Sequence, residues 1–294
     1  MAVRQYTRGM RLWSVIYPVF LYFAVSQLLD VVQQMLPFMA SQDAVMRQGV
    51  DTLGGLLVLY AGFLKKGRSG EMWRGVSASA GDGSEKTRIA GTRAAGELKE
   101  SGAYAQAGVS GGQLFGFFIA ALLLGCGSFA LNNLIALTDL IERSDSYQFV
   151  EQSFYSSRLV WEIAVLCILT PIAEELLYRR IVFCGLRSWI GRWGAVLGSA
   201  LLFGVMHMNL VQMLYASGLG ILLGILMEYY GNVGIAMCGH IAANLLSVLR
   251  SELGLVSGLE KGSGVYWAVT LAALAVTTGL TLWYAWRMRR EDAP

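Results

Sequence analysis

Long runs of apolar residues, rather than amphipathic periods, dominate this 294-residue sequence and restrict what it can fold into. The hydrocarbon core of a bilayer is about 30 Å thick, so a spanning helix needs roughly 20 apolar residues, which predicts about eight spans. Charged residues make up 15% of the chain, against roughly 25% in soluble domains. We therefore expect an all-α polytopic membrane protein. The predicted spans are 12–30, 46–64, 113–138, 159–183, 193–209, 211–230, 232–250 and 264–286.

The second predicted span is the weakest, because Arg47 and Asp51 leave a clean apolar core only from Leu53 to Leu64. Seven spans are therefore the alternative. The chain divides into N-terminal spans (1–64), a polar loop rich in Gly and Ser (65–112) and a second transmembrane domain (113–294). The loop has no apolar period, so we expect it to be flexible and leave its role open.

Basic residues precede the first span, occur in the loop 65–112 and follow the fourth and last spans. With eight spans all of them lie on one face, which the positive-inside rule makes cytoplasmic. Both termini are thus predicted to be cytoplasmic, in a multi-pass protein of a bacterial plasma membrane. The formal charge of +3 does not indicate nucleic-acid binding. The four cysteines form no CxxC pair, which argues against disulfides and a cysteine zinc site.

Two adjacent carboxylates, Glu174 and Glu175, interrupt the fourth predicted span. A charged side chain in a bilayer costs at least about 2.5 to 3.5 kcal/mol, so such residues are functional candidates. Glu175 and Arg179 share a helix face, whereas Glu174 is turned by about 100 degrees. Glu174 is thus left for chemistry, and burial makes it a stronger proton acceptor. A structural ion network of these three residues is the alternative.

Both histidines of the chain, His207 and His240, lie within predicted spans. Phe203 precedes His207 by one helical turn and is expected to form an apolar wall beside the imidazole. His240 and Asn244 have the same spacing, which predicts that ring and carboxamide point into one cavity. A lone membrane histidine is usually a hydrogen-bonding group between helices. Two histidines together with the glutamates indicate a catalytic site.

These residue types suit hydrolysis of a peptide bond. Glu174 would deprotonate a water molecule, and His240 with Asn244 would hydrogen-bond the developing oxyanion. His207 would orient the water or protonate the leaving amine, and the sequence does not choose between these roles. A zinc ion held by the same four side chains is the alternative. HExxH is absent and asparagine is an uncommon zinc ligand, which favours metal-free catalysis.

Two other carboxylates, Glu162 and Glu228, lie near the ends of predicted spans. Long polar side chains at such positions reach the headgroup region. We expect both to be solvated.

Three motifs occur in order: EExxxR (Glu174 to Arg179), FxxxH (Phe203 to His207) and HxxxN (His240 to Asn244). Together they resemble the CAAX prenyl endopeptidase and bacteriocin-processing family of intramembrane proteases, also called CPBP or Abi. The motif region is 159–250. The resemblance implies about eight helices around an intramembrane catalytic chamber that opens toward the cytoplasm. It implies the catalytic set Glu174, His207, His240 and Asn244, supported by Glu175, Arg179 and Phe203.

The expected function is that of an intramembrane endopeptidase that acts with glutamate-activated water. Its partners would be the lipid bilayer and a peptide or prenylated protein, either CaaX-type or another membrane-associated substrate. A non-proteolytic bacteriocin immunity or membrane scaffold protein is the second hypothesis. A proton-coupled transporter is the third, since buried Glu and His residues also suit transport. The clustering of polar residues and the lack of an inverted repeat argue against transport.

Overall fold

The structure is a computed structural model that describes residues 8–65, 111–155, 157–254 and 258–291. Within these ranges every element is a helix, as predicted. The predicted flexible loop, 65–112, lies outside the described residues except at its two ends. The elements are α1 (Arg8–Met35), α2 (Pro37–Ala40), α3 (Ala44–Leu59), η1 (Tyr60–Leu64), α6 (Gly111–Ala136), α7 (Asp145–Phe154), α8 (Leu159–Trp161), η2 (Glu162–Leu169), α9 (Thr170–Glu175), η3 (Leu176–Phe183), α10 (Cys184–Val205), α11 (Leu210–Tyr230), α12 (Val233–Glu252) and α13 (Gly264–Glu291), the η segments being π-helical.

Five helices in the described part of the chain are long and apolar enough to cross a membrane. The chain is therefore an integral membrane protein, as its composition predicts. The expected number of about eight spans is not confirmed by this count. The five spans are Leu12–Met35, Leu114–Ala136, Leu210–Tyr230, Val233–Glu252 and Gly264–Arg290.

The three remaining predicted spans coincide with shorter or interrupted helices. The range 46–64 divides between α3 and η1, and 159–183 runs through α8, η2, α9 and η3. The range 193–209 begins beyond a break in α10 at Gly191, where φ is 77°. Glycine adopts this left-handed backbone without a steric penalty. One helical path therefore runs from 159 to 190, and the chain changes direction before the last part of α10.

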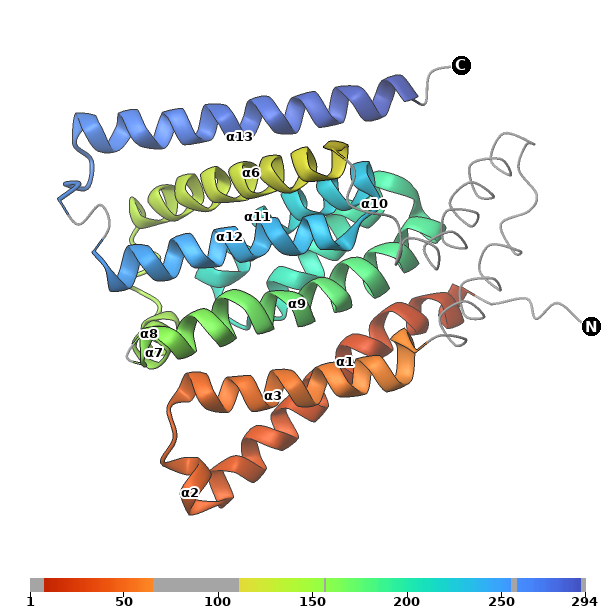
Figure 1. Cartoon of the computed structure of the whole chain (residues 1–294), viewed down its shortest axis with the longest axis vertical. Coiled ribbons are helices and arrows are strands. Elements are labelled where there is room, and N and C mark those ends of the chain that lie inside the picture. Colours follow the sequence, from red (N-terminus) through yellow and green to blue (C-terminus); the bar gives the residue numbers. More distant parts are fainter. Residues whose placement is uncertain (1–7, 66–110, 156, 255–257, 292–294) are drawn as a thin grey trace, which may run out of the picture.

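The helices lie roughly side by side, with α13 along one edge and α1 with α3 along the other (Figure 1). Between these edges α12 packs on α6, α11 on α10, and α6 on α13. The start of α1 and the end of α13 lie at the same end of the bundle (Figure 1). Both described ends of the chain thus lie at one face, which remains predicted to be cytoplasmic.

Small residues on α11 allow it to approach α10 closely. A Cβ atom added at Gly220 would lie 2.9 Å from the Ala200 Cα and 3.3 Å from Cδ1 of Phe203. A Cβ atom at Gly224 would lie 3.3 Å from the Val196 Cα. Such small residues are common where membrane helices pack closely. The contact matters for function because Phe203 lies within it.

Gly220→Val is expected to destabilise the protein by about 1 to 3 kcal/mol, the usual cost of overpacking. The obstacle is the Ala200 backbone, which cannot rotate away. Thermal unfolding in detergent measures the effect. Gly279→Val on α13 is the matched control, because a Cβ atom there meets nothing within 4 Å. Equal unfolding temperatures for the two variants would contradict the prediction.

The expectation that Glu162 and Glu228 are solvated is wrong. The Glu228 side chain is 8% exposed and accepts hydrogen bonds from Arg187 Nε at 2.7 Å and Arg192 Nε at 2.8 Å. Arg192 Nη1 also donates to the Met288 carbonyl oxygen at 3.0 Å. The two ion pairs of Glu228 therefore connect α11 to α10, and Arg192 connects α10 to α13. Glu162 has no exposed surface, and α3 and α12 pack against its helix η2.

Candidate active site

The helix that carries the two glutamates changes its hydrogen-bond pattern just before them. The Thr170 N–H donates to the Val165 carbonyl oxygen, which is the five-residue spacing of a π-helix. In this spacing the Leu166 carbonyl would pair with residue 171, which is a proline and has no N–H. Asn244 Nδ2 of α12 donates to that carbonyl instead, at 2.8 Å. Asn244 of the HxxxN motif therefore supplies the hydrogen-bond donor that Pro171 lacks.

Glu175 forms a fully buried ion pair with Arg179. Arg179 Nε lies 3.2 Å from Glu175 Oε2, and neither side chain is exposed. The pairing follows from the four-residue spacing, as predicted. Glu175 Oε1 also lies 3.0 Å from His240 Nδ1. One carboxylate thus binds a cation on its own helix and an imidazole on α12.

Glu174 lies on the other side of His240. Its Oε2 is 3.7 Å from His240 Nε2, and its side chain is 19% exposed, whereas that of Glu175 has no exposed surface. The separation is longer than a direct hydrogen bond and is within reach of a bridging water. His240 therefore lies between two carboxylates, of which only Glu174 is accessible.

His207 lies in the turn that follows α10. Its Nδ1 is 2.9 Å from the Phe203 carbonyl oxygen. A carbonyl oxygen only accepts hydrogen bonds, so Nδ1 carries the proton and donates. In the neutral ring Nε2 is then an acceptor. His207 also interacts electrostatically with Glu174, so the two groups share one site.

The Phe203 ring brings the three motifs together. It packs edge-to-face against the rings of His207 and His240, with centroids 5.0 and 5.7 Å apart. The Arg179 guanidinium lies 5.3 Å from the centroid of the same ring. The predicted apolar wall beside His207 is therefore present. It also positions His240 and the buried arginine.

The structure brings the predicted residues together and adds one contact that the sequence did not predict. Asn244, which was expected to share a cavity with His240, donates one amide hydrogen to the Leu166 carbonyl oxygen. The amide nitrogen has a second hydrogen, so one donor remains. The assignment of both residues to an oxyanion site stays a prediction.

Sequence reasoning missed Tyr178. This residue follows Glu174 by four positions, is 2% exposed and packs its ring 5.0 Å from that of Phe203. Its hydroxyl has no hydrogen-bond partner among the described residues. The four-residue spacing from Glu174 was a usable signal, because it puts both side chains on one helix face.

A zinc ion held by Glu174, His207, His240 and Asn244 was the alternative to metal-free catalysis. Among the described residues no three or more His, Cys, Asp and Glu side chains are arranged to hold a metal ion. His240 Nδ1 faces Glu175, and the Asn244 amide binds a carbonyl oxygen. Two of the four side chains thus have protein partners in this structure, and metal-free catalysis stays a prediction.

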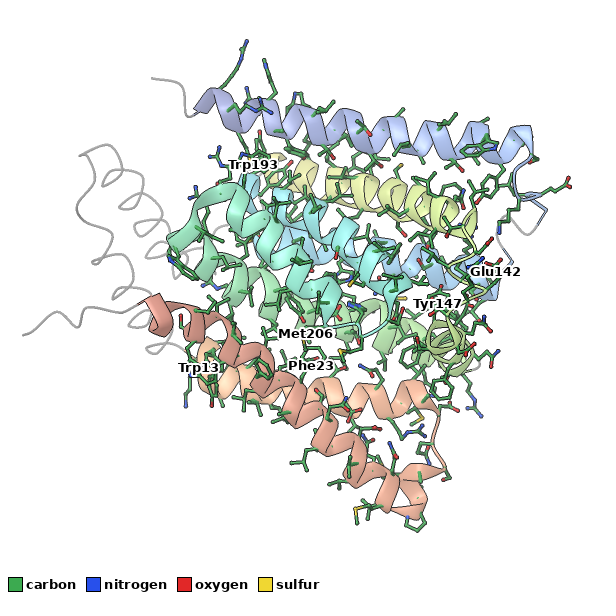
Figure 2. The ribbon with its side chains drawn as sticks, turned by 180° about the vertical axis from the view of Figure 1, so that it is seen from behind. Trp13, Phe23, Glu142, Tyr147, Trp193 and Met206 are labelled. Atoms are coloured by element: carbon green, nitrogen blue, oxygen red, sulfur yellow. The ribbon has the colours of Figure 1, made fainter. Side chains whose placement is uncertain are left out.

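The fold and the site define a class of protein: an all-helical integral membrane protein that encloses two glutamates, two histidines and an asparagine. Figure 2 shows Met206, the neighbour of His207, between the ends of the bundle marked by Trp13 and Trp193 on one side and Glu142 and Tyr147 on the other. The turn that carries His207 thus lies between the two ends of the bundle.

Residues 156–246 match the family described as type II CAAX prenyl endopeptidase Rce1-like. The match covers about a third of the chain and includes every motif residue. No curated protein and no solved structure matches the chain. The resemblance inferred from the three motifs is therefore confirmed.

Proposed function

We propose that the chain is an intramembrane endopeptidase in which Glu174 activates the attacking water. The observation that carries the proposal is the position of His240, with Nδ1 3.0 Å from Glu175 and Nε2 3.7 Å from Glu174. Glu175 accepts a hydrogen bond from Nδ1, which fixes the orientation of the ring. A carboxylate plays this part toward the histidine of catalytic triads.

The reaction follows from the donors and acceptors of the site. Water binds between Glu174 and His207, donating one proton toward the Glu174 carboxylate and the other toward His207 Nε2. Glu174 takes its proton as the water oxygen attacks the peptide carbonyl carbon. The oxyanion that forms accepts hydrogen bonds from His240 Nε2 and the second Asn244 hydrogen. The C–N bond then breaks, and Glu174 returns its proton to the leaving amine.

The surroundings of His207 support access from the lipid. Val205, Met208 and Leu210, which flank His207, are all exposed, and Met208 is 82% exposed. In a membrane protein such apolar surface faces the acyl chains. A substrate with a lipid chain can approach along this surface. We therefore propose a prenylated CaaX-type peptide, or another membrane-associated peptide, as substrate.

The purified wild type is expected to cleave a prenylated CaaX peptide in detergent, with a KM more than about tenfold below that of the same peptide without its prenyl group. Each buried CH₂ contributes about 0.8 kcal/mol, which favours the prenylated form. Chelation with EDTA or phenanthroline is expected to leave kcat unchanged, because Glu174 rather than a metal ion activates the water in the proposed reaction. Mass spectrometry of the products measures both effects.

A bacteriocin-precursor peptide serves as a second substrate in the same assay. Cleavage that disappears on chelation and returns with zinc would overturn the metal-free reaction. Failure of the wild type to cleave any of the three peptides would count against the endopeptidase. It would favour the non-proteolytic immunity or scaffold hypothesis.

A further inference from the structure

The turn between α10 and α11 carries His207 and contains a strained backbone. Met208, the next residue, has a φ of 60° and is the one residue other than glycine with a positive φ in the part of the chain that the structure describes. A residue with a Cβ atom is strained in this left-handed region, and the strain persists only where the surrounding structure holds it. The Met208 side chain is largely exposed, so its own packing does not hold the turn. The contacts that fix the turn therefore come from its neighbours.

Asn209 binds the chain on both sides of Met208. Its Oδ1 accepts a hydrogen bond from the Gln212 N–H at 2.8 Å and so caps the start of α11. Its Nδ2 donates to the His207 carbonyl oxygen at 3.4 Å and to Gln212 Oε1. The amide has two hydrogens, so both of these bonds form at once. The buried side chain of Asn209 thus connects the residue before the left-handed position to the helix that follows it.

The imidazole of His207 is fixed relative to its own backbone. Nδ1 donates to the Phe203 carbonyl oxygen at 2.9 Å, and the His207 N–H donates to the Gly204 carbonyl oxygen at 3.1 Å. The ring and the N–H are therefore bonded to the last turn of α10, and the carbonyl oxygen is bonded to Asn209. Because Nδ1 is already engaged, the direction of Nε2 follows from the position of the backbone at this residue.

The two helices meet backbone to backbone one turn before His207. A Cβ atom added at Gly204 would lie 2.6 Å from the Met213 carbonyl oxygen of α11. The Met213 N–H in turn donates to the Asn209 carbonyl oxygen at 2.8 Å. The chain passes from α10 to α11 within residues 206–209. A left-handed residue makes this short connection possible, and a change in its backbone would move the imidazole.

We infer that Asn209 is a positioning residue for His207, because its amide holds the left-handed turn that directs His207 Nε2 toward the attacking water. The inference rests on the proposed function, in which Nε2 accepts a hydrogen bond from that water. In this role Asn209 touches neither the substrate nor the water. Its effect on the reaction passes through the orientation of the imidazole alone.

Asn209→Asp tests the inference in the full-length protein, with the prenylated CaaX peptide as substrate. Aspartate caps a helix as well as asparagine does, but its carboxylate has no hydrogen to donate to the His207 carbonyl oxygen. We expect kcat to fall roughly 10- to 100-fold with KM unchanged, because a displacement of about 1 Å in a catalytic group costs this much. Asn232→Asp is the matched control. Asn232 caps α12 by accepting from the Gly234 N–H at 2.8 Å, and this variant should leave kcat unchanged.

The substitution Met208→Gly separates positioning of the turn from capping of the helix. Glycine adopts a φ of 60° without the steric penalty, so the turn then depends less on Asn209. Asn209→Asp is therefore expected to lower kcat by a much smaller factor in the Met208→Gly protein than in the wild type. Equal factors in the two proteins would overturn the inference, because a lost cap or an added charge would act in both.

A second measurement needs no substrate. The chain has two histidines, so labelling histidine with ¹⁵N gives two imidazoles, and His207→Gln assigns their nuclear magnetic resonance signals. The signals of the wild type and of Asn232→Asp should show His207 with its proton on Nδ1. Asn209→Asp should shift the ring toward a mixture of both tautomers, because Nδ1 loses its fixed acceptor. Unchanged His207 signals in this variant would contradict the inference.

The inference and the proposed function fail in different ways. If Glu174→Gln is inactive while Asn209→Asp matches Asn232→Asp in kcat, the inference fails and the proposed function stands. If Glu174→Gln is fully active, the proposed function fails and the inference fails with it.

Discussion

Replacing Glu174 by glutamine is expected to lower kcat for peptide cleavage roughly 100- to 10 000-fold, the usual contribution of a general base. Glutamine keeps the size of the side chain but cannot take a proton from water. The buried Glu175 does not substitute for Glu174, because it is already paired with Arg179 and His240. Initial rates with the prenylated peptide measure the loss, and size-exclusion chromatography shows whether the variant is folded.

Glu162→Gln is the control for the same change on the same helical path. Glu162 is fully buried in η2, so the substitution also neutralises a buried carboxylate. It lies three turns before Glu174 and is not among the groups that act on it. Unchanged activity in this variant would show that the loss belongs to Glu174. Equal losses in both variants would indicate a general effect of buried charge.

Arg179→Met is expected to destabilise the protein by about 3 to 5 kcal/mol, because it leaves the buried Glu175 without its cation. The two side chains are 3.2 Å apart and have no exposed surface. The guanidinium also packs on the Phe203 ring, so Met does not replace every contact. Thermal unfolding in detergent measures the change, and a midpoint lower by on the order of 10 °C is expected.

The double variant Arg179→Met/Glu175→Gln separates stability from catalysis. Removing both charges leaves no uncompensated ion, so much of the stability should return. Activity should not return, because His240 Nδ1 then lacks the carboxylate that fixes its ring. A double variant as unstable as Arg179→Met would contradict the assignment of the loss to the unpaired charge.

Local spacing was enough to predict the contacts within one helix. The pairing of Glu175 with Arg179 and the contact of Phe203 with His207 each join residues one turn apart. Such residues share a helix face in any helical fold. The membrane helices could also be predicted from the sequence, because bilayer thickness sets the length of apolar run that a spanning helix needs.

The structure changed the predictions that depend on irregular helices. The predicted span 159–183 coincides with a helical path that alternates between α and π turns. The predicted span 193–209 coincides with the part of α10 that follows its break at Gly191. Hydropathy reports the length of an apolar run but not its hydrogen-bond pattern. The contact of Asn244 with Leu166 could not be predicted for the same reason. The Leu166 carbonyl is free only because a π turn precedes Pro171.

The sequence by itself determined the membrane class, the helical fold, the resemblance to CAAX proteases and the residues gathered at the site, because these depend on apolar length and on spacing along the chain. Only the tertiary structure decided that His240 faces Glu175 with one nitrogen and Glu174 with the other. These contacts join residues far apart in the chain, and helix packing rather than local spacing sets the distances between them.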